Sequence, residues 1–418
     1  MRTYLGVLCL VALAFIPWTN QTYPGGFAEL WKEAGDMASQ TAAVILAHHP
    51  KSVASIQAKY ISTPAAQSPK VRILLVPGHE PDFGGAEYKD LKERDMTVEL
   101  AQDLQGFLDT DPHYQTFVTR DTQAWDPTFA DYFKNSWDDI VAWQKASKAE
   151  ESKLIQLDEA PKPVSSVYHV TAPANVALRL YGVTKWANEN DIDITLHIHF
   201  NDYPGHAAGQ PGEHSGFAIY VPAAQYDNSS TTKAIAESIF AQLKRYNAVS
   251  DLPGESDGIV DEPELIAIGA NNTADSASML IEYAYIYEQQ FQDPAVRSLA
   301  LKDLAYQTYL GLQGFFDPTH AIDLSKRYET LALPHSWSGS ITAGSPVSPD
   351  IFALQTALTA DGDYPPADES MNDCPRTGKL GPCTKAALQS FQKKYGIAGE
   401  DGMVGSSTIS KLNQLFSL

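Results

Sequence analysis

Four side chains in this sequence have the types and surroundings of a catalytic metal site. His79 follows the apolar run ILLVPG, and Glu93 comes fourteen residues later, where a helical pattern begins. His199 lies in TLHIHFND, and Glu282 lies inside the apolar run SMLIEYAYI. Two histidines and one glutamate around an open position are a ligand set of catalytic zinc, and an unligated glutamate can serve as general base. Each residue alone also fits a plainer role, such as a helix-capping acid for Glu93.

His197 competes with His199 as a metal ligand. Side chains on a strand alternate between its faces, so His197, His199 and Asn201 share one face. Spacing alone leaves open which histidine binds the metal. Glu282 is flanked by apolar residues, and burying its carboxylate requires a nearby cation or a raised pKa. A zinc ion would meet that requirement.

The segments around these residues predict alternating strands and helices. Strand-like runs cover residues 71–76, 114–120, 192–200, 216–222 and 278–286, and helical periodicity covers residues 96–108, 174–188, 231–246 and 294–315. This order predicts an α/β fold with a largely parallel mixed sheet flanked by helices, over residues 71–316. Loops at strand ends converge in such a fold, which would bring the four sites together. Residues 125–167 are polar and predict an insertion with some helix.

Residues 348–418 predict a separate module of three helices. Capping residues and apolar stripes place these helices near residues 348–358, 387–395 and 406–415. The runs LQTAL and LQSFQ are similar to one another and suggest a small internal duplication. Residues 317–347 contain Pro, Gly and Ser without a clear period and predict a linker.

Cys374 and Cys383 lie close together in this module. In an exported chain such a pair predicts a local disulfide, and two free buried thiols are the alternative. No histidines stand at ligand spacing beside them, so they make a poor zinc site.

Composition and the N-terminus indicate the compartment. The net charge of −21 over 418 residues excludes nucleic acid as the main partner and disfavours docking on anionic lipid. Met1 and Arg2 precede an apolar run over residues 5–18, which is typical of a signal peptide or an N-terminal anchor within residues 1–20. Residues 21–70 predict a helix over 27–46 followed by a linker. We therefore expect an exported protein that touches membrane only through such an anchor, and the oligomeric state stays open.

The stretch ILLVPGHEPDFGGAEYKDLKERDMTVELA, with FVTRD, HIHFND, HSGFAIYVP and MLIEYAYI after it, resembles zinc-dependent N-acetylmuramoyl-L-alanine amidases. The resemblance implies one zinc ion held by His79, Glu93 and His199, with Glu282 as general base and proton donor. The resemblance favours His199 as the metal ligand. His197 replaces the small residue that the family usually has two positions before that ligand. His197, Asn201 and His214 are candidate substrate contacts, and Glu80 and Asp82 are expected to be loop residues.

Two departures from the family concern the substrate groove. The segment YAYIYE that follows Glu282 lacks the family's Gly-Phe-x-Ser-Asn. The insertion over residues 125–167 exceeds the usual connection, which raises the hypothesis that it covers the groove until a partner moves it.

The runs LQTAL, GKLGPCTKAALQSFQKKYG and DGMVGSSTISKL resemble the peptidoglycan-binding domain of wall hydrolases. That resemblance implies peptidoglycan as partner, a location in the cell envelope or outside the cell, and a binding module on a tether of about thirty residues. Two rival functions stay open: a zinc peptidase that cuts the stem peptide, and an inactive wall-binding protein.

Overall fold

The structure is a computed structural model that describes residues 49–61, 69–167, 171–203, 206–207, 209–317 and 330–417. The expected signal segment and the helix expected over residues 27–46 lie outside these ranges. Within the ranges, no helix combines the length and the apolar character that crossing a bilayer would require.

A six-stranded mixed sheet lies at the centre, in the order β4-β1-β5-β8-β6-β7. Its strands are β1 (Val71–Pro77), β4 (Tyr114–Val118), β5 (Ile194–Asn201), β6 (Ala218–Pro222), β7 (Ile259–Glu262) and β8 (Ala277–Tyr285). β4, β1, β5 and β8 run parallel, whereas β6 is antiparallel to β8 and parallel to β7. The expected α/β fold is confirmed. β7 escaped prediction because four residues are too few to show a period.

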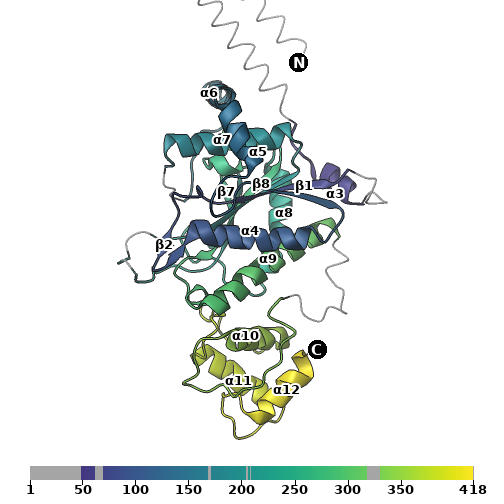
Figure 1. Ribbon diagram of the computed structural model, residues 1–418, viewed down its shortest axis with the longest axis vertical. Helices are drawn as coiled ribbons and strands as arrows, with labels where there is room; N and C mark the ends of the chain where they lie inside the picture. Colours follow the sequence, from purple (N-terminus) through teal and green to yellow (C-terminus); the bar gives the residue numbers. More distant parts are fainter. Residues whose placement is uncertain are drawn as a thin grey trace, which may run out of the picture.

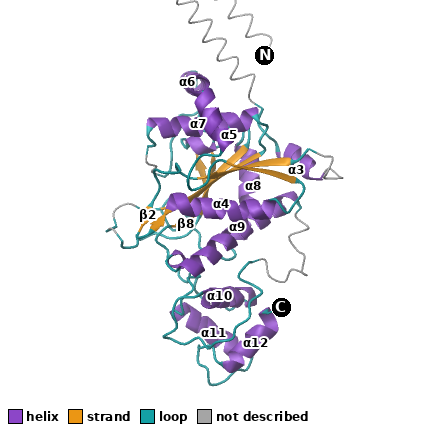
Figure 2. Ribbon diagram, viewed as in Figure 1, coloured by secondary structure: helices purple, strands orange, loops and turns teal. Residues whose placement is uncertain are grey.

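Helices cover both faces of the sheet (Figures 1 and 2). α4 (Glu93–Leu108), α8 (Ser229–Leu243) and α9 (Pro294–Phe316) lie on one side, and α5 (Pro127–Asn135), α6 (Trp137–Gln156) and α7 (Ala174–Glu189) lie on the other. The alternation along β1 accounts for two cores, because Ile73 and Leu75 join the first and Leu74 and Val76 join the second. The insertion thus forms α5 and α6, which pack on α7.

Two short elements complete the catalytic domain. β2 (Glu87–Tyr88) and β3 (Leu91–Lys92) form a small antiparallel ribbon between β1 and α4. α3 (Val53–Ile61) lies in a part of the chain where the sequence predicted no helix, and its Ile56 is fully buried in the main core. Nine residues with one buried apolar position carry little periodic signal, which explains the omission.

The C-terminal module contains the expected three helices, α10 (Pro349–Asp361), α11 (Pro382–Lys394) and α12 (Ser406–Phe416). The Ser348 side chain caps α10 by accepting a hydrogen bond from the backbone of Ile351. The predicted disulfide is present between Cys374 and Cys383, with an S–S distance of 2.04 Å.

The linker predicted over residues 317–347 is wrong for its second half. Leu333, Trp337 and Ile341 are buried in the core of the C-terminal module. Trp337 is fastened there, because its indole donates to the Asp350 carbonyl at 2.9 Å and its backbone N–H donates to Asn413 at 2.8 Å. Isolated apolar residues between Pro, Gly and Ser gave no periodic signal, yet tertiary contacts bury them. Residues 318–329 lie outside the described ranges.

Candidate metal centre

His79 is presented at the end of β1 by a closely packed turn. Its backbone is left-handed, with φ of 69°, a conformation that residues other than glycine seldom adopt. A Cβ added at Gly78 would lie 2.4 Å from Cε1 of His199, and one added at Gly85 would lie 2.9 Å from Cδ2 of His79. The two glycines therefore leave the space in which the two imidazoles meet.

Glu93, the first residue of α4, stands between these imidazoles. Its Oε1 lies 2.8 Å from Nε2 of His79 and 3.0 Å from Nδ1 of His199. Oε1 also accepts a hydrogen bond from the backbone of Phe200 at 3.1 Å, and Oε2 accepts one from Ala86 at 2.8 Å. These bonds hold the carboxylate in place.

The three residues fit the donor set of a zinc site. One ligand atom from each of His79, Glu93 and His199 can be chosen so that all lie within 4.8 Å of one another. Nε2 of His79 is buried, and among the described residues its polar neighbour is the Glu93 carboxylate oxygen at 2.8 Å, with no hydrogen bond formed. A buried, unpartnered ring nitrogen beside a carboxylate is suited to a cation.

The charge states also suit a metal. Burial works against ionisation of Glu93, but His79 and His199 outweigh it and hold the pKa of Glu93 well below its usual range. Burial lowers the pKa of His199, although Glu93 opposes this. A charged carboxylate and a neutral imidazole are the forms that bind zinc.

His197 lies apart from this cluster. It is 1% exposed, its Nε2 is buried without a hydrogen-bond partner among the described residues, and it is absent from the group of side chains close enough to share a metal ion. Burial, followed by the influence of His199, lowers the pKa of His197 to about 3. The geometry thus brings His199, not His197, together with His79 and Glu93.

Glu282 lies on β8 directly beside His199 on β5 in the strand register. Its Oε2 is buried and has no hydrogen-bond partner among the described residues. Burial, then the charges of Glu93 and Glu255, raises the pKa of Glu282 well above its usual value. A carboxyl group with a raised pKa can both accept and return a proton near neutral pH.

Arg120 supports the site and was missed by the sequence analysis, although it stands in the quoted run FVTRD. It is 2% exposed, and its guanidinium donates to the carbonyl oxygens of Pro77, Gly78, Asp121 and Arg94. It therefore ties the end of β1 to the start of α4. No spacing rule indicates an arginine whose partners are backbone oxygens.

Glu80 is a loop residue, as expected, and its side chain makes two polar contacts. It is 7% exposed, and its carboxylate pairs with Arg179 on α7 at 3.1 Å and accepts from the indole of Trp125 at 3.2 Å. Glu80 thus connects the turn after His79 to the insertion. Asp82 is exposed, in keeping with the expectation for it.

The two other candidate substrate contacts lie near the carboxyl ends of β5 and β8. Asn201 ends β5 and donates to the buried acid Glu255 at 3.3 Å. His214 packs edge-on against Tyr203, with ring centroids 4.4 Å apart, and pairs with Asp251. His214 also lines an open hollow of about 570 Å³ together with Tyr88, Lys89, Tyr287 and Gln292. Tyr287 belongs to the YAYIYE segment, so this departure from the family builds one wall of the hollow.

Comparison with known proteins gives two family matches. Residues 73–313 match the model of the N-acetylmuramoyl-L-alanine amidase family, and residues 347–412 match that of a peptidoglycan binding domain. A curated relative, the zinc D-Ala-D-Ala carboxypeptidase of Streptomyces albus G, is 34% identical over 98 residues. That match covers 23% of this chain and 35% of the relative, so the chain spans about a third of the curated relative's length.

Several solved structures are similar to the chain. An N-acetylmuramoyl-L-alanine amidase from Clostridium difficile 630 is 16% identical, with 60% of this chain and 100% of that chain covered and a TM-score of 0.37. The apo form of an N-acetylmuramyl-L-alanine amidase from Mycobacterium abscessus is 14% identical, with the same coverage and a TM-score of 0.38. Because the family model matches residues 73–313 of 418, more than half of its length, the chain belongs to the N-acetylmuramoyl-L-alanine amidase family.

Proposed function

We propose that this protein hydrolyses the amide bond between N-acetylmuramic acid and L-alanine in peptidoglycan. The observation that carries the proposal is the convergence of His79, Glu93 and His199, with Glu282 beside them on the next strand. We assign one zinc ion to the three ligands. The match to a peptidoglycan binding domain supports peptidoglycan as the partner and the cell envelope or its exterior as the location. Export through the N-terminal segment is part of the same proposal.

The chain's own residues divide the reaction between them. A bound zinc ion would supply a water of lowered pKa and polarise the lactyl carbonyl. Glu282 accepts the proton of the attacking water and delivers it to the leaving nitrogen of L-alanine, for which its raised pKa is suited. Its Oε2 has no hydrogen-bond partner among the described residues, so this oxygen is available for the proton transfer. Asn201 at the end of β5 and His214 in the loop before β6 are our candidates for contacts with the peptide or the sugar.

Mass analysis of digested peptidoglycan tests the activity. We expect new L-alanine amino termini and intact muramic acid in the products, and a chelator should abolish them. Zinc should restore them. Cleavage between amino acids of the stem peptide would instead support the zinc peptidase, and absence of any zinc-dependent product would support the inactive wall-binding protein.

Zinc content of two single variants tests the ligand assignment. His199→Ala should lose stoichiometric zinc, because it removes one of the three converging ligands. His197→Ala should retain zinc, because His197 lies outside the cluster of His79, Glu93 and His199. Loss of zinc from the second variant alone would reverse the assignment.

A further inference from the structure

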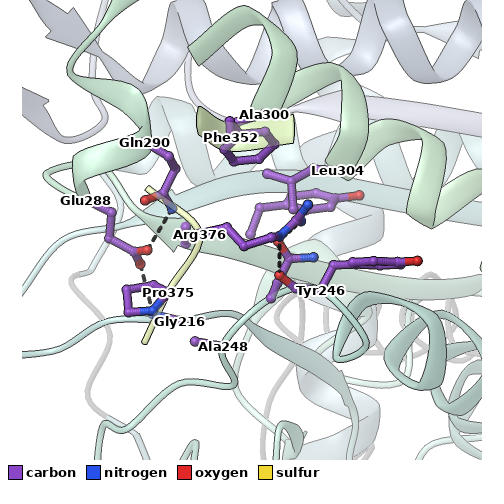
Figure 3. A pocket seen from close by; sticks show the side chains of 13 residues that line it. Gly216, Tyr246, Ala248, Glu288, Gln290, Ala300, Leu304, Phe352, Pro375 and Arg376 are labelled. Atoms are coloured by element: carbon purple, nitrogen blue, oxygen red, sulfur yellow. Dashed lines mark hydrogen bonds between the residues drawn. The ribbon is translucent and has the colours of Figure 1, made fainter. Parts of the chain in front are cut away.

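One buried ion pair joins the C-terminal module to the catalytic domain. Nη2 of Arg376 lies 3.1 Å from Oδ2 of Asp303 on α9, and each side chain is 2% exposed. The guanidinium also donates to the Tyr246 carbonyl at 2.8 Å and to Asn247 at 3.3 Å. Figure 3 shows Arg376 in a cavity that it lines together with Tyr246, Asn247 and Phe352 of α10. Its Cζ lies 4.8 Å from the ring centre of Phe352 and 5.0 Å from that of Tyr246.

Further contacts extend the interface. Phe352 is part of the catalytic domain's main core rather than that of its own module. Asn372 donates to the Val249 carbonyl at 2.5 Å. Cys374, between Asn372 and Arg376 in the sequence, is joined to α11 by the disulfide, which fastens this loop to its module. These contacts dock the module on the catalytic domain.

The segment of the catalytic domain that the C-terminal module contacts, residues 246–249, continues in the sequence toward residues near the metal centre. Next to Val249, the backbone of Ser250 donates to the Phe217 carbonyl at 2.8 Å, and its hydroxyl donates to Glu255. Glu255 is 1% exposed and also accepts from Tyr220 and from Asn201. Asn201 comes two residues after His199 on β5. Residues 246–255 thus touch the C-terminal module at one end and the catalytic strand at the other.

We infer that the C-terminal module is a positioning part of the catalytic domain in addition to its binding role. Arg376 and Asn372 hold residues 246–249, this segment holds Ser250 and Glu255, and Glu255 orients Asn201 beside the metal centre. This inference rests on the proposed function. It differs from tethering, because a tether acts only by raising the local concentration of wall and leaves hydrolysis of small soluble substrates unchanged.

Kinetics of the full-length, zinc-loaded protein on a soluble muramoyl-peptide monomer test the inference. We expect Arg376→Ala and Asn372→Ala to lower kcat, the first on the order of tenfold, since small displacements near reacting groups are costly. Zinc content should stay unchanged. The matched control is Lys302→Ala, which removes the exposed cation next to Asp303 on α9 and should leave kcat at the wild-type value.

A double variant separates positioning from general destabilisation. Glu255→Gln should lower kcat, and adding it to Arg376→Ala should cost less than the product of the two single effects, because both act through one segment. Multiplicative effects would contradict the inference. If Arg376→Ala fails to fold, the same comparison with Glu255→Gln can be made with Arg376→Lys and with Asn372→Ala.

The outcomes distinguish this inference from the proposed function. Wild-type kcat on the monomer in every interface variant, with slower digestion of intact wall only, would overturn the inference and leave a simple docking role. An inactive wild-type protein would overturn the proposed function instead. In that case, amide hydrogen exchange of residues 250–255 still tests the inference. Faster exchange in Arg376→Ala than in the wild type would support the coupling between the module and this segment, and unchanged exchange would refute it.

Discussion

At the scale of single residues, the site depends on two glycines that leave space as much as on the ligands that fill it. Gly78 and Gly85 have no Cβ, and each missing atom would occupy space taken by an imidazole. The ligands themselves are common residue types. What makes them a candidate metal centre is that Glu93 meets both histidines through one oxygen.

We predict that Gly78→Ala greatly weakens zinc binding. The added methyl group would lie 2.4 to 2.6 Å from three ring atoms of His199, so the ring must move. Isothermal titration with zinc should show at least a tenfold loss of affinity, about 1.4 kcal/mol. The control is Gly106→Ala within α4, where a Cβ meets nothing within 4 Å, and its affinity should match the wild type. Equal affinities in the two variants would contradict the packing argument.

We predict that Glu282→Gln abolishes hydrolysis, retains zinc and stabilises the metal-free protein at neutral pH. Rate losses for removing a general base are about 10²- to 10⁴-fold. The pKa of Glu282 is raised by burial first, so the folded state holds its proton more tightly than the unfolded chain does. The wild type therefore loses stability as pH rises above about 4, and the glutamine variant lacks this loss. Urea unfolding with chelator at pH 4 and pH 7 should show the variant's advantage only at the higher pH.

At the scale of elements, the ends of parallel strands gather residues from distant parts of the chain. β1 delivers His79, α4 begins with Glu93, and β5 and β8 run in register so that His199 stands beside Glu282. Arg120 then fastens β1 to α4 through backbone carbonyls, which makes the arrangement of these elements depend on one buried side chain.

We predict that Arg120→Met destabilises the fold and weakens zinc binding. Removing the guanidinium leaves several buried carbonyl oxygens without a donor, at a cost of about 1–3 kcal/mol each before relaxation. Urea unfolding should show a loss of at least about 2 kcal/mol. Arg245→Met is the control, because Arg245 is exposed and its guanidinium donates to Gln242 at the surface, and exposed polar contacts of this kind contribute at most about 1 kcal/mol. A smaller loss for Arg120→Met than for the control would refute the anchoring role.

At the scale of the whole molecule, the catalytic domain and the C-terminal module are packed together through a shared interface. The C-terminal module contributes Phe352 to the catalytic core, and the catalytic domain contributes Asp303 to the Arg376 pair. In Figure 1 the module lies against α9, at the far end from α6. The C-terminal module is thereby held in a fixed relation to the candidate metal centre.

We predict that the double variant Cys374→Ser with Cys383→Ser is less stable by on the order of 2–3 kcal/mol, because the disulfide restricts the unfolded chain. Thermal unfolding should show this, and a reductant should destabilise the wild type but leave the double variant unchanged. A reductant effect of equal size in both proteins would show that it acts elsewhere.

Much of the fold follows from the sequence by itself. Apolar runs of strand length and helical stripes predicted five of the six sheet strands and the principal helices, because burial imposes periods of two and 3.6 on the residues that face a core. Capping residues predicted the C-terminal helices. The candidate ligands His79, Glu93 and His199 were predicted by type and by resemblance, and the cysteine pair by compartment.

Only the tertiary structure decided which distant groups meet. Periodicity tells which face of a strand is buried but not how far along it a neighbour approaches, so spacing left His197 and His199 equivalent until β1 and α4 were placed. The pairs Glu80 with Arg179 and Asp303 with Arg376 join residues 99 and 73 positions apart. Local patterns carry no signal for such pairs, because what selects them is the cost of burying a charge without a partner, and burial is a property of the folded chain.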